Sequence, residues 1–273
     1  MANDELLIYA VKAAVMAGDE ILKVYVSDFS VELKDDNSPL TFADKKSHET
    51  IIKELAETYL PVLSEEGKEI LYDERKNWPL LWIIDPLDGT KEFVKRNGEF
   101  TVNIALVENG KPILGVVYAP VKKVLYFAGK GAGAFRYHLP SISERSPSDR
   151  YQEMEIDKLI KSSEKLPVRQ KTHKFTIVAS RSHLTKETDD FISKMKKEHG
   201  DINLISAGSS LKICLVAEGA ADVYPRFGPT MEWDTAAGQA IVDGAGKKLI
   251  DVTTNQPMIY NRENLKNNSF IVQ

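Results

Sequence analysis

The stretch Leu80–Phe93, LLWIIDPLDGTKEF, decides the fold, because an apolar run ends there at two carboxylates, Asp85 and Asp88. The run holds aliphatic and aromatic residues without alternation, which is typical of a strand that is covered on both faces. Pro86 fixes one backbone torsion and Gly89 permits a tight turn, so both acids are expected at one rigid corner. That corner is a candidate cage for a hard cation.

Acids and glycine after a strand are also ordinary turn formers, so this short motif alone does not establish a metal site. Two further acids lie at predicted element ends: Glu65 follows a short apolar run, and Asp234 begins a late helix. Gathered in one place, these carboxylates would repel one another without a counter-charge. Oxygen ligands without a His or Cys pair favour Mg²⁺ over zinc, and carboxylate-held Mg²⁺ is typical of phosphoryl hydrolysis.

Two residues are candidates for handling the attacking water. The hydroxyl of Thr90 follows the acidic corner directly, where it could pass a hydrogen bond between a water molecule and an acid such as Asp44. Asp44 has a second interpretation, because an acid in the first turn of a helix also stabilises the helix dipole and its cap. Both interpretations stay open at this stage.

Composition restricts the class of protein. With 273 residues, 42% hydrophobic and 28% charged, the chain predicts a globular protein of one large or two closely packed domains. A net charge of −4 gives no general attraction to nucleic acid, so a phosphate ligand needs local cations or metals. No obligate protein partner is expected, and a small anionic ligand stays possible.

The single cysteine, Cys214, lies in an apolar run, which indicates a buried thiol and excludes an internal disulfide. No apolar segment is long enough to predict a transmembrane helix, and the MANDELL start does not have the pattern of a signal peptide. We therefore expect a cytoplasmic protein, with peripheral contact to the inner face of the membrane left open.

Periodicity predicts two helices and a strand in the first part of the chain. Residues 3–26 have helical spacing, residues 29–33 alternate as a short strand, and a second helix begins after Thr41. Its buried face is expected to carry Ile51, Ile52, Leu55 and Tyr59. A β-rich block follows, with an antiparallel meander predicted over 100–107, 112–119, 124–128 and 134–137.

The glycine-rich segment GKGAGAF, residues 129–135, looks like a phosphate loop, but it joins two strands and opens no helix, so we interpret it as a turn. We predict an N-terminal α+β metal-binding domain over 1–138, a polar connecting segment with one short helix over 139–173, and a C-terminal α/β domain over 174–273. In the last, strands are expected at 175–180, 202–206, 221–224, 248–251 and 270–272, and helices at 186–199, 209–218 and 234–243.

Cations are expected at the strand ends of this second domain. Gly208–Lys212, GSSLK, has either the composition of a capped helix with a solvated lysine or that of an anion site at a helix start. The segments 180–183, SRSH, and 224–229, YPRFGP, add further cations. In an open α/β sheet the ends of the strands face the ligand crevice.

Three motifs carry a resemblance to a known family. D-P-L-D-G-T at 85–90, E-E-G at 65–67 and W-D-T-A-A-G at 233–238 resemble the lithium-sensitive, Mg²⁺-dependent phosphatases of the inositol monophosphatase superfamily. Within it, the chain is most similar to 3'(2'),5'-bisphosphate nucleotidases of the CysQ type, through DGTKEF, NGEFTVNIALV, GVVYAPV, SRSH, GSSLK, LVAEG and YPRFGPT. The similarity covers nearly the whole chain.

The resemblance implies a five-layered αβαβα sandwich with its site between two domains, two or three Mg²⁺ ions, and hydrolysis of 3'-phosphoadenosine 5'-phosphate (PAP) to AMP and phosphate in sulfate assimilation. One ion would be held by Glu65, Asp85 and the carbonyl of Leu87, and a second by Asp85, Asp88 and Asp234. The water would be oriented by Glu65, Asp44 and Thr90. The substrate contacts would come from Gly89, Thr90, His183, Ser209, Lys212, Arg226 and Asp234.

The segment around 141–172 is longer than the family pattern leads us to expect, which leaves the rim of the nucleotide pocket open. Two other functions also stay open. The first is an inositol monophosphatase, inositol polyphosphate 1-phosphatase or sugar phosphatase on the same fold, because the metal chemistry does not depend on the leaving group. The second, of another class, is a nucleotide sensor without catalysis.

Overall fold

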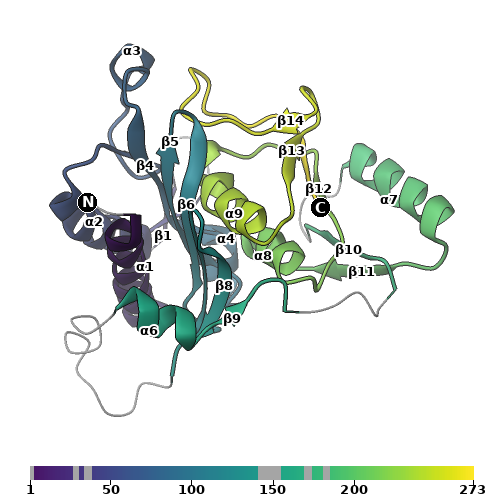
Figure 1. Cartoon of the computed structure of the whole chain (residues 1–273), viewed down its shortest axis with the longest axis horizontal. Coiled ribbons are helices and arrows are strands. Elements are labelled where there is room, and N and C mark those ends of the chain that lie inside the picture. Colours follow the sequence, from purple (N-terminus) through teal and green to yellow (C-terminus); the bar gives the residue numbers. More distant parts are fainter. Residues whose placement is uncertain (1–2, 27–30, 34–38, 141–154, 169–173, 181–184) are drawn as a thin grey trace.

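The computed structural model describes residues 3–26, 31–33, 39–140, 155–168, 174–180 and 185–273. Helices and sheets alternate in layers (Figure 1), and this order confirms the expected αβαβα sandwich. The helices are α1 Asn3–Tyr25, α2 Phe42–Leu55, α3 Tyr72–Arg75, α4 Thr90–Val94, α6 Ile156–Lys161, α7 Lys186–His199, α8 Leu211–Ala217 and α9 Glu232–Gly244, with a 3₁₀ turn at Ala56–Thr58.

A seven-stranded sheet forms the centre of the molecule, in the order β3-β4-β5-β6-β7-β8-β9. Within the described part of this sheet, only the pair β3 and β4 is parallel. The predicted antiparallel meander is confirmed in β5 to β8. The bounds are β3 Val62–Ser64, β4 Leu80–Asp88, β5 Thr101–Glu108, β6 Lys111–Ala119, β7 Val124–Gly129, β8 Gly133–His138 and β9 Glu164–Lys165. A separate hairpin pairs β1 Val31–Leu33 with β2 Pro39–Thr41.

The unbroken apolar run of β4 separates two hydrophobic cores. Trp82 and Ile84 pack with residues of α1 and α2 on one face, whereas Leu81 and Ile83 pack with residues of α8 and α9 on the other. All four side chains are buried. Because alternate residues of a strand point to opposite faces, a strand between two helical layers must be apolar at every position.

Two glycines allow α9 to pack closely against the sheet and against α8. A Cβ atom on Gly115 of β6 would lie 2.3 Å from the carbonyl oxygen of Ala237 in α9, and one on Gly238 would lie 2.8 Å from Ile213 in α8. A side chain at either glycine would therefore push α9 away from its neighbours. The position of α9 matters because its first turn carries Asp234.

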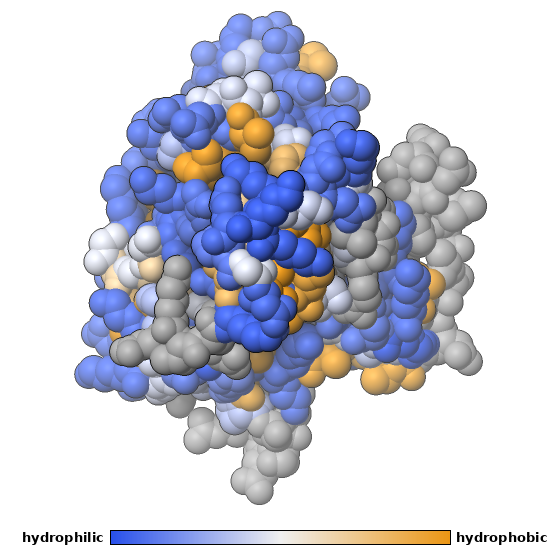
Figure 2. Space-filling model, turned by 90° about the vertical axis from the view of Figure 1, so that its right-hand side faces the viewer, coloured by the Kyte–Doolittle hydropathy of each residue, from blue (hydrophilic) through white to orange (hydrophobic). Residues whose placement is uncertain are grey.

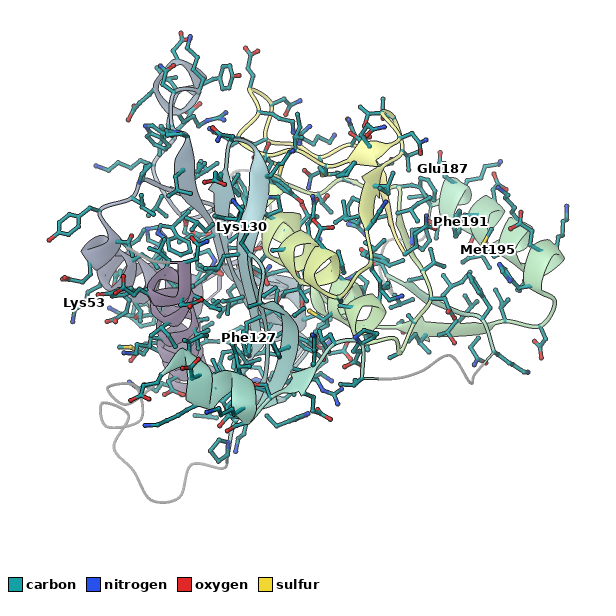
Figure 3. The ribbon with its side chains drawn as sticks, viewed as in Figure 1. Lys53, Phe127, Lys130, Glu187, Phe191 and Met195 are labelled. Carbon is teal, nitrogen blue, oxygen red and sulfur yellow. The ribbon has the colours of Figure 1, made fainter. Side chains whose placement is uncertain are left out.

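The other half of the molecule has smaller sheets. A four-stranded sheet has the order β12-β15-β13-β14, and the parallel pair of β10 and β11 is linked to β12 by a bridge between Ile177 and Val223. The bounds are β10 Thr176–Ala179, β11 Asn203–Ser206, β12 Tyr224–Arg226, β13 Leu249–Asp251, β14 Gln256–Pro257 and β15 Phe270–Val272. Helix α7 covers β10 through residues such as Met195, and its charged residues, such as Glu187, lie on the surface (Figure 3). Seen from the α7 side, the molecule is mostly hydrophilic, with smaller hydrophobic areas (Figure 2).

The structure differs from the sequence predictions in three places. Tyr59 is 87% exposed rather than buried, because α2 ends at Leu55 and the chain leaves the 3₁₀ turn with a left-handed residue. Strand β12 begins at Tyr224 rather than at 221, and β9, inside the predicted connecting segment, pairs with β8. Residue 29, where a strand was expected to begin, lies outside the described residues. The proposed division into two domains and a connecting segment stays a prediction.

Candidate functional site

The corner that carries the two acids is formed by the last residues of β4, and hydrogen bonds hold it in place. Asp85 is buried, and its Oδ1 accepts a hydrogen bond of 3.1 Å from the backbone N–H of Leu87. The hydroxyl of Ser47 in α2 donates to the carbonyl of Pro86 at 2.6 Å. Gly89 has a φ of 94°, a left-handed value that glycine adopts without strain. The chain therefore turns sharply after the two acids, as the sequence predicts.

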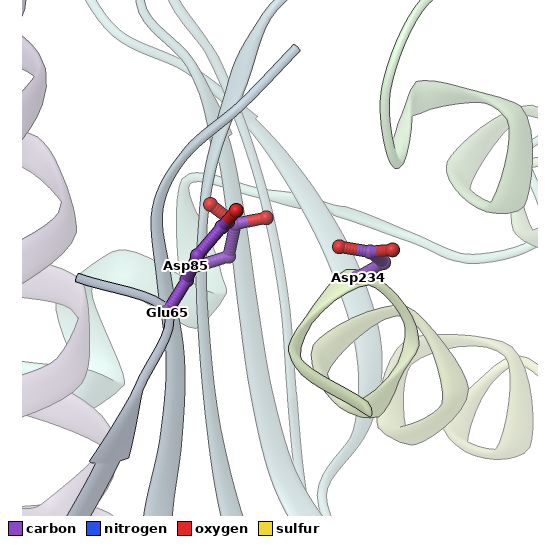
Figure 4. A group of neighbouring side chains, drawn as sticks. All are labelled: Glu65, Asp85 and Asp234. Carbon is purple, nitrogen blue, oxygen red and sulfur yellow. The ribbon is translucent and has the colours of Figure 1, made fainter. Parts of the chain in front are cut away.

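Three acids from separate parts of the chain converge at this corner. Glu65 follows β3, the parallel neighbour of β4, and Asp234 lies in the first turn of α9. One carboxylate oxygen from each of Glu65, Asp85 and Asp234 lies within 4.8 Å of the other two. Figure 4 shows Glu65 and Asp85 close together, with Asp234 facing them from the end of its helix. An all-oxygen set of this kind fits Mg²⁺.

Asp88 borders this group and has hydrogen-bond donors of its own. Its Oδ2 accepts from the hydroxyl of Ser210 at 2.8 Å and lies 3.4 Å from Nδ2 of Asn103. Asp234 is held in a similar way, because its Oδ2 accepts from the backbone N–H of Met231 at 2.7 Å. Donors from the protein thus restrict the orientation of both carboxylates.

Without a bound cation, the ionised forms of Asp85 and Asp234 are disfavoured. Burial, followed by the charges of Glu65, Asp88, Asp234 and Asp44, raises the pKa of Asp85 well above its ordinary value. Burial and the charge of Asp88 raise the pKa of Asp234 to about 8, although the Met231 N–H opposes this shift. A bound cation would reverse both effects, because its charge favours the ionised carboxylates.

The two residues expected to handle water lie beside the corner. Asp44 is buried in the first turn of α2, and its charge contributes to the raised pKa of Asp85. The hydroxyl of Thr90 lies 3.5 Å from the carbonyl oxygen of Leu87, to which it donates. Both side chains are therefore neighbours of the acidic cluster, although their roles stay predictions.

A pocket adjoins the acids and holds about 230 Å³ of space open to water. Its wall combines segments from both halves of the chain. Asp88, Gly89, Thr90, Ser209, Lys212, Arg226 and Asp234 all line it, so most of the expected substrate contacts share one cavity. The remaining one, His183, lies outside the described residues.

Two cations in this wall have buried nitrogen atoms. Lys212 is buried, which lowers the pKa of its ammonium group to about 8, and its Nζ donates to the carbonyl of Ser209 at 2.6 Å. One terminal nitrogen of Arg226 donates to the carbonyl of Pro229 at 3.1 Å, whereas its buried Nε has no hydrogen-bond partner among the residues that the structure describes. A buried donor without a partner is costly, so an anionic ligand is a suitable occupant.

The turn before α8 has an unusual backbone. Ser209 has a φ of 42°, which is rare for a residue other than glycine, and its hydroxyl donates to the carbonyl of Glu99 at 2.5 Å. The N–H of Gly208 donates to the carboxylate of Glu99 at 2.9 Å. The sequence reasoning did not single out Glu99 or Asn103, and it included Ser210 only as part of the GSSLK motif. Asn103 left a signal, because it is a polar residue between two apolar residues of β5.

Comparison with known proteins places this geometry in a family. The family model described as the inositol monophosphatase family matches residues 2–271. The chain belongs to the inositol monophosphatase family. The resemblance seen in the sequence motifs is thereby confirmed.

Curated relatives narrow the resemblance within the inositol monophosphatase family. The chain is 46% identical over 239 residues to the 3'(2'),5'-bisphosphate nucleotidase CysQ of Salmonella typhimurium, with 86% of each protein covered. It is 43% identical to the protein of the same name from Escherichia coli K12, with 94% of each covered. The crystal structure of CysQ from Bacteroides thetaiotaomicron matches with a TM-score of 0.89 and 51% identity, over 99% of this chain and 97% of that one.

The raised carboxylate pKa values predict how metal and pH together affect stability. In the unfolded protein, Asp has a pKa of about 3.9. A higher pKa in the folded protein stabilises the fold at low pH, and this stabilisation is lost as the pH rises through the folded pKa. For Asp234 that value is about 8. Mg²⁺ needs the ionised acids, so it should compensate for the loss.

We therefore expect the melting temperature in EDTA to fall between pH 6 and pH 9, and Mg²⁺ at about 100 times its Kd to raise it by about 5 °C at pH 8.5 but by much less at pH 6. Differential scanning calorimetry measures both effects. Asp85→Asn, which removes one of the charges, should abolish most of the Mg²⁺ shift. An equal Mg²⁺ shift at both pH values would contradict this account of the cluster.

Proposed function

We propose that this protein removes the 3'-phosphate of PAP by hydrolysis and releases AMP and phosphate. The observation that carries the proposal is one pocket lined by two acids of the site, Asp88 and Asp234, and by two cations with buried polar atoms, Lys212 and Arg226. A bisphosphate needs two anion sites. In this pocket, metal ions held by the acids would bind one phosphate, and the two cations would bind the other. The names of the curated relatives, bisphosphate nucleotidases, agree with this substrate.

The proposal includes two or three Mg²⁺ ions, as the family resemblance implies. Glu65, Asp85 and the Leu87 carbonyl would hold one ion, and Asp85, Asp88 and Asp234 a second. When bound, such ions neutralise the phosphate oxygens, acidify water and stabilise the leaving oxygen. The protein supplies carboxylates already gathered at one point, with Asp85 and Asp234 held by the backbone N–H groups of Leu87 and Met231.

The residues beside the corner orient the nucleophile in this proposal. In this role the Thr90 hydroxyl rotates its hydrogen away from the carbonyl of Leu87 and donates it in a hydrogen bond to a carboxylate oxygen of Asp44. Its Oγ1 then accepts a hydrogen bond from the attacking water, and Glu65 holds the water from the other side. The position of Thr90, directly after the acids and in the pocket wall, supports this role. Burial of Asp44 keeps bulk water from competing for that proton.

The cations select the substrate. Lys212 and Nε of Arg226 would contact the 5'-phosphate, because both are desolvated and an oxyanion satisfies each of them. Ser209, Gly89 and His183 complete the proposed nucleotide contacts. A monophosphate such as inositol monophosphate has no second anion for these cations, which is why we place the inositol phosphatase second.

A nucleotide sensor without catalysis is a weaker candidate. A binding protein needs neither a converging acid set nor a hydroxyl beside it, and here Thr90 accompanies Glu65, Asp85 and Asp234. Among the residues that the structure describes, no helix is long and apolar enough to cross a membrane. A cytoplasmic location stays a prediction, and lithium sensitivity is implied by the family resemblance alone.

Replacing the buried lysine separates the two phosphatase candidates. Lys212→Ala should lower kcat/KM for PAP by about 10- to 100-fold, since a hydrogen bond to a charged group contributes about 1.5–3 kcal/mol. Hydrolysis of inositol monophosphate should change by less than about threefold, because that substrate has no second phosphate to lose a contact. Phosphate release from both substrates gives the comparison.

Lys212→Met keeps most of the buried volume and should behave like Lys212→Ala, which controls for a packing defect. Similar losses on PAP and on inositol monophosphate would remove the basis for assigning a bisphosphate substrate.

Removing the metal or one of its proposed ligands tests catalysis itself. EDTA should abolish phosphate release from PAP, and Asp88→Asn should reduce it by at least about 100-fold, with the EDTA effect reversed by added Mg²⁺. Phosphate release is the readout, and binding of PAP measured by calorimetry is the control. A protein that binds PAP and releases no phosphate under any metal condition would be the sensor, and undiminished turnover in EDTA would refute the metal mechanism.

A further inference from the structure

A line of buried polar side chains runs from β5 to the acidic cluster. The hydroxyl of Thr101 donates to Oδ1 of Asn103 at 3.0 Å, and Nδ2 of Asn103 donates to Oγ of Ser210 at 2.9 Å. Ser210 in turn donates to Oδ2 of Asp88 at 2.8 Å. The first three of these residues are at most 3% exposed, so water does not compete for their hydrogen bonds.

The order of donors and acceptors in this line is determined. The carboxylate of Asp88 lies beside the same end of the Asn103 side chain and accepts hydrogen bonds, so the amide N–H₂ group is the one that faces Ser210. Ser210 has a single hydroxyl proton and two acceptors within reach, Oδ2 of Asp88 at 2.8 Å and the backbone carbonyl of Asp234 at 2.9 Å. A charged carboxylate is the stronger acceptor, so the proton is directed at Asp88.

The alternative role for this serine is a helix cap. Ser210 occupies the N-cap position of α8, where serine commonly accepts a hydrogen bond from the first turn. Within the described chain, however, its side chain makes no such cap bond. The hydroxyl of Ser210 donates to Asp88 instead of capping its own helix.

We propose that Ser210 is a positioning residue that aims Asp88 at the metal site, and that Asn103 fixes the hydroxyl of Ser210 for this purpose. The inference rests on the proposed function, because it treats Asp88 as a metal ligand. A ligating carboxylate depends on such supporting hydrogen bonds, and their loss typically weakens metal binding by about 10- to 100-fold. Ser210 is also the N-cap residue of α8, the helix that carries Lys212. It therefore connects the metal side of the pocket to the anion side.

The test measures Mg²⁺ binding to the full chain by titration calorimetry, together with kcat and KM for PAP at saturating Mg²⁺. Ser210→Ala should weaken Mg²⁺ binding by about tenfold and leave KM for PAP within about twofold. Ser210→Thr, which keeps the hydroxyl, should retain binding within about threefold of the wild type. Ser163→Ala is the matched control, because it removes a hydroxyl that donates to a carbonyl in the remote helix α6.

Asn103→Ala is a second, independent variant, and it should weaken Mg²⁺ binding less than Ser210→Ala does. Asn103 acts mainly through Ser210, at 2.9 Å, because its direct contact with Asp88 is long, at 3.4 Å. The double variant should therefore bind Mg²⁺ about as weakly as Ser210→Ala alone.

Three results would overturn the inference: unchanged Mg²⁺ binding in Ser210→Ala, a raised KM with normal Mg²⁺ binding, or additive losses in the double variant. The second result would assign the hydroxyl to the placement of α8 rather than of Asp88. A wild-type protein that binds no Mg²⁺ would instead refute the proposed function itself, so the two failures are distinguishable.

Discussion

Repulsion among carboxylates at the end of β4 is the constraint on which the site depends. Folding places Glu65, Asp85 and Asp234 within 4.8 Å of one another, and it raises the pKa of the latter two. Such an arrangement weakens the metal-free protein at the pH where the acids ionise, so hydrophobic burial elsewhere must offset it. Much of that burial comes from β4 itself, whose alternate residues enter two different cores.

The position of α9 is secured from the side opposite the acids. Glu232, in the same helical turn as Asp234, is fully buried and accepts hydrogen bonds from the backbone N–H groups of Asn261 and Arg262 and from Nε of Arg262. Arg75, also buried, donates to the carbonyls of Arg262 and Glu263. A buried charge is tolerated only when its partners are in place, so these contacts restrict how the first turn of α9 can lie. They hold Asp234 against the repulsion of its neighbours.

Local patterns predicted what depends on local sequence. The bounds of α7, the meander from β5 to β8 and the buried strand before Asp85 all follow from periodicity and turn residues. The exposure of Tyr59 was not predictable, because helical spacing continues past the residue where α2 ends. Strand β9 was missed because it has only two residues, both exposed.

In the candidate site, too, local sequence indicated some residues and not others. The acids were recognisable because they stand at element ends within ordered motifs. The contact between Asn103 and Ser210 was not, since it joins residues 107 positions apart and depends on how α8 is placed against β5. Likewise, the hydrogen bond between Glu99 and Gly208 depends on a turn with a strained φ at Ser209, which no local pattern indicates. Long-range polar contacts carry little trace in a single sequence, because each partner alone looks like an ordinary polar residue.

The charges in the pocket also imply that metal and substrate bind cooperatively. Without metal, the acids and cations compensate one another, as shown by the charges of Asp88 and Asp234, which raise the pKa of Lys212 against the larger effect of its burial. Divalent ions at the acids would remove this compensation and leave Lys212 and Arg226 as unbalanced positive charges in a desolvated wall. An anion would then be attracted from both sides of the pocket. Metal binding should therefore strengthen substrate binding, and by linkage the substrate should strengthen metal binding by the same factor.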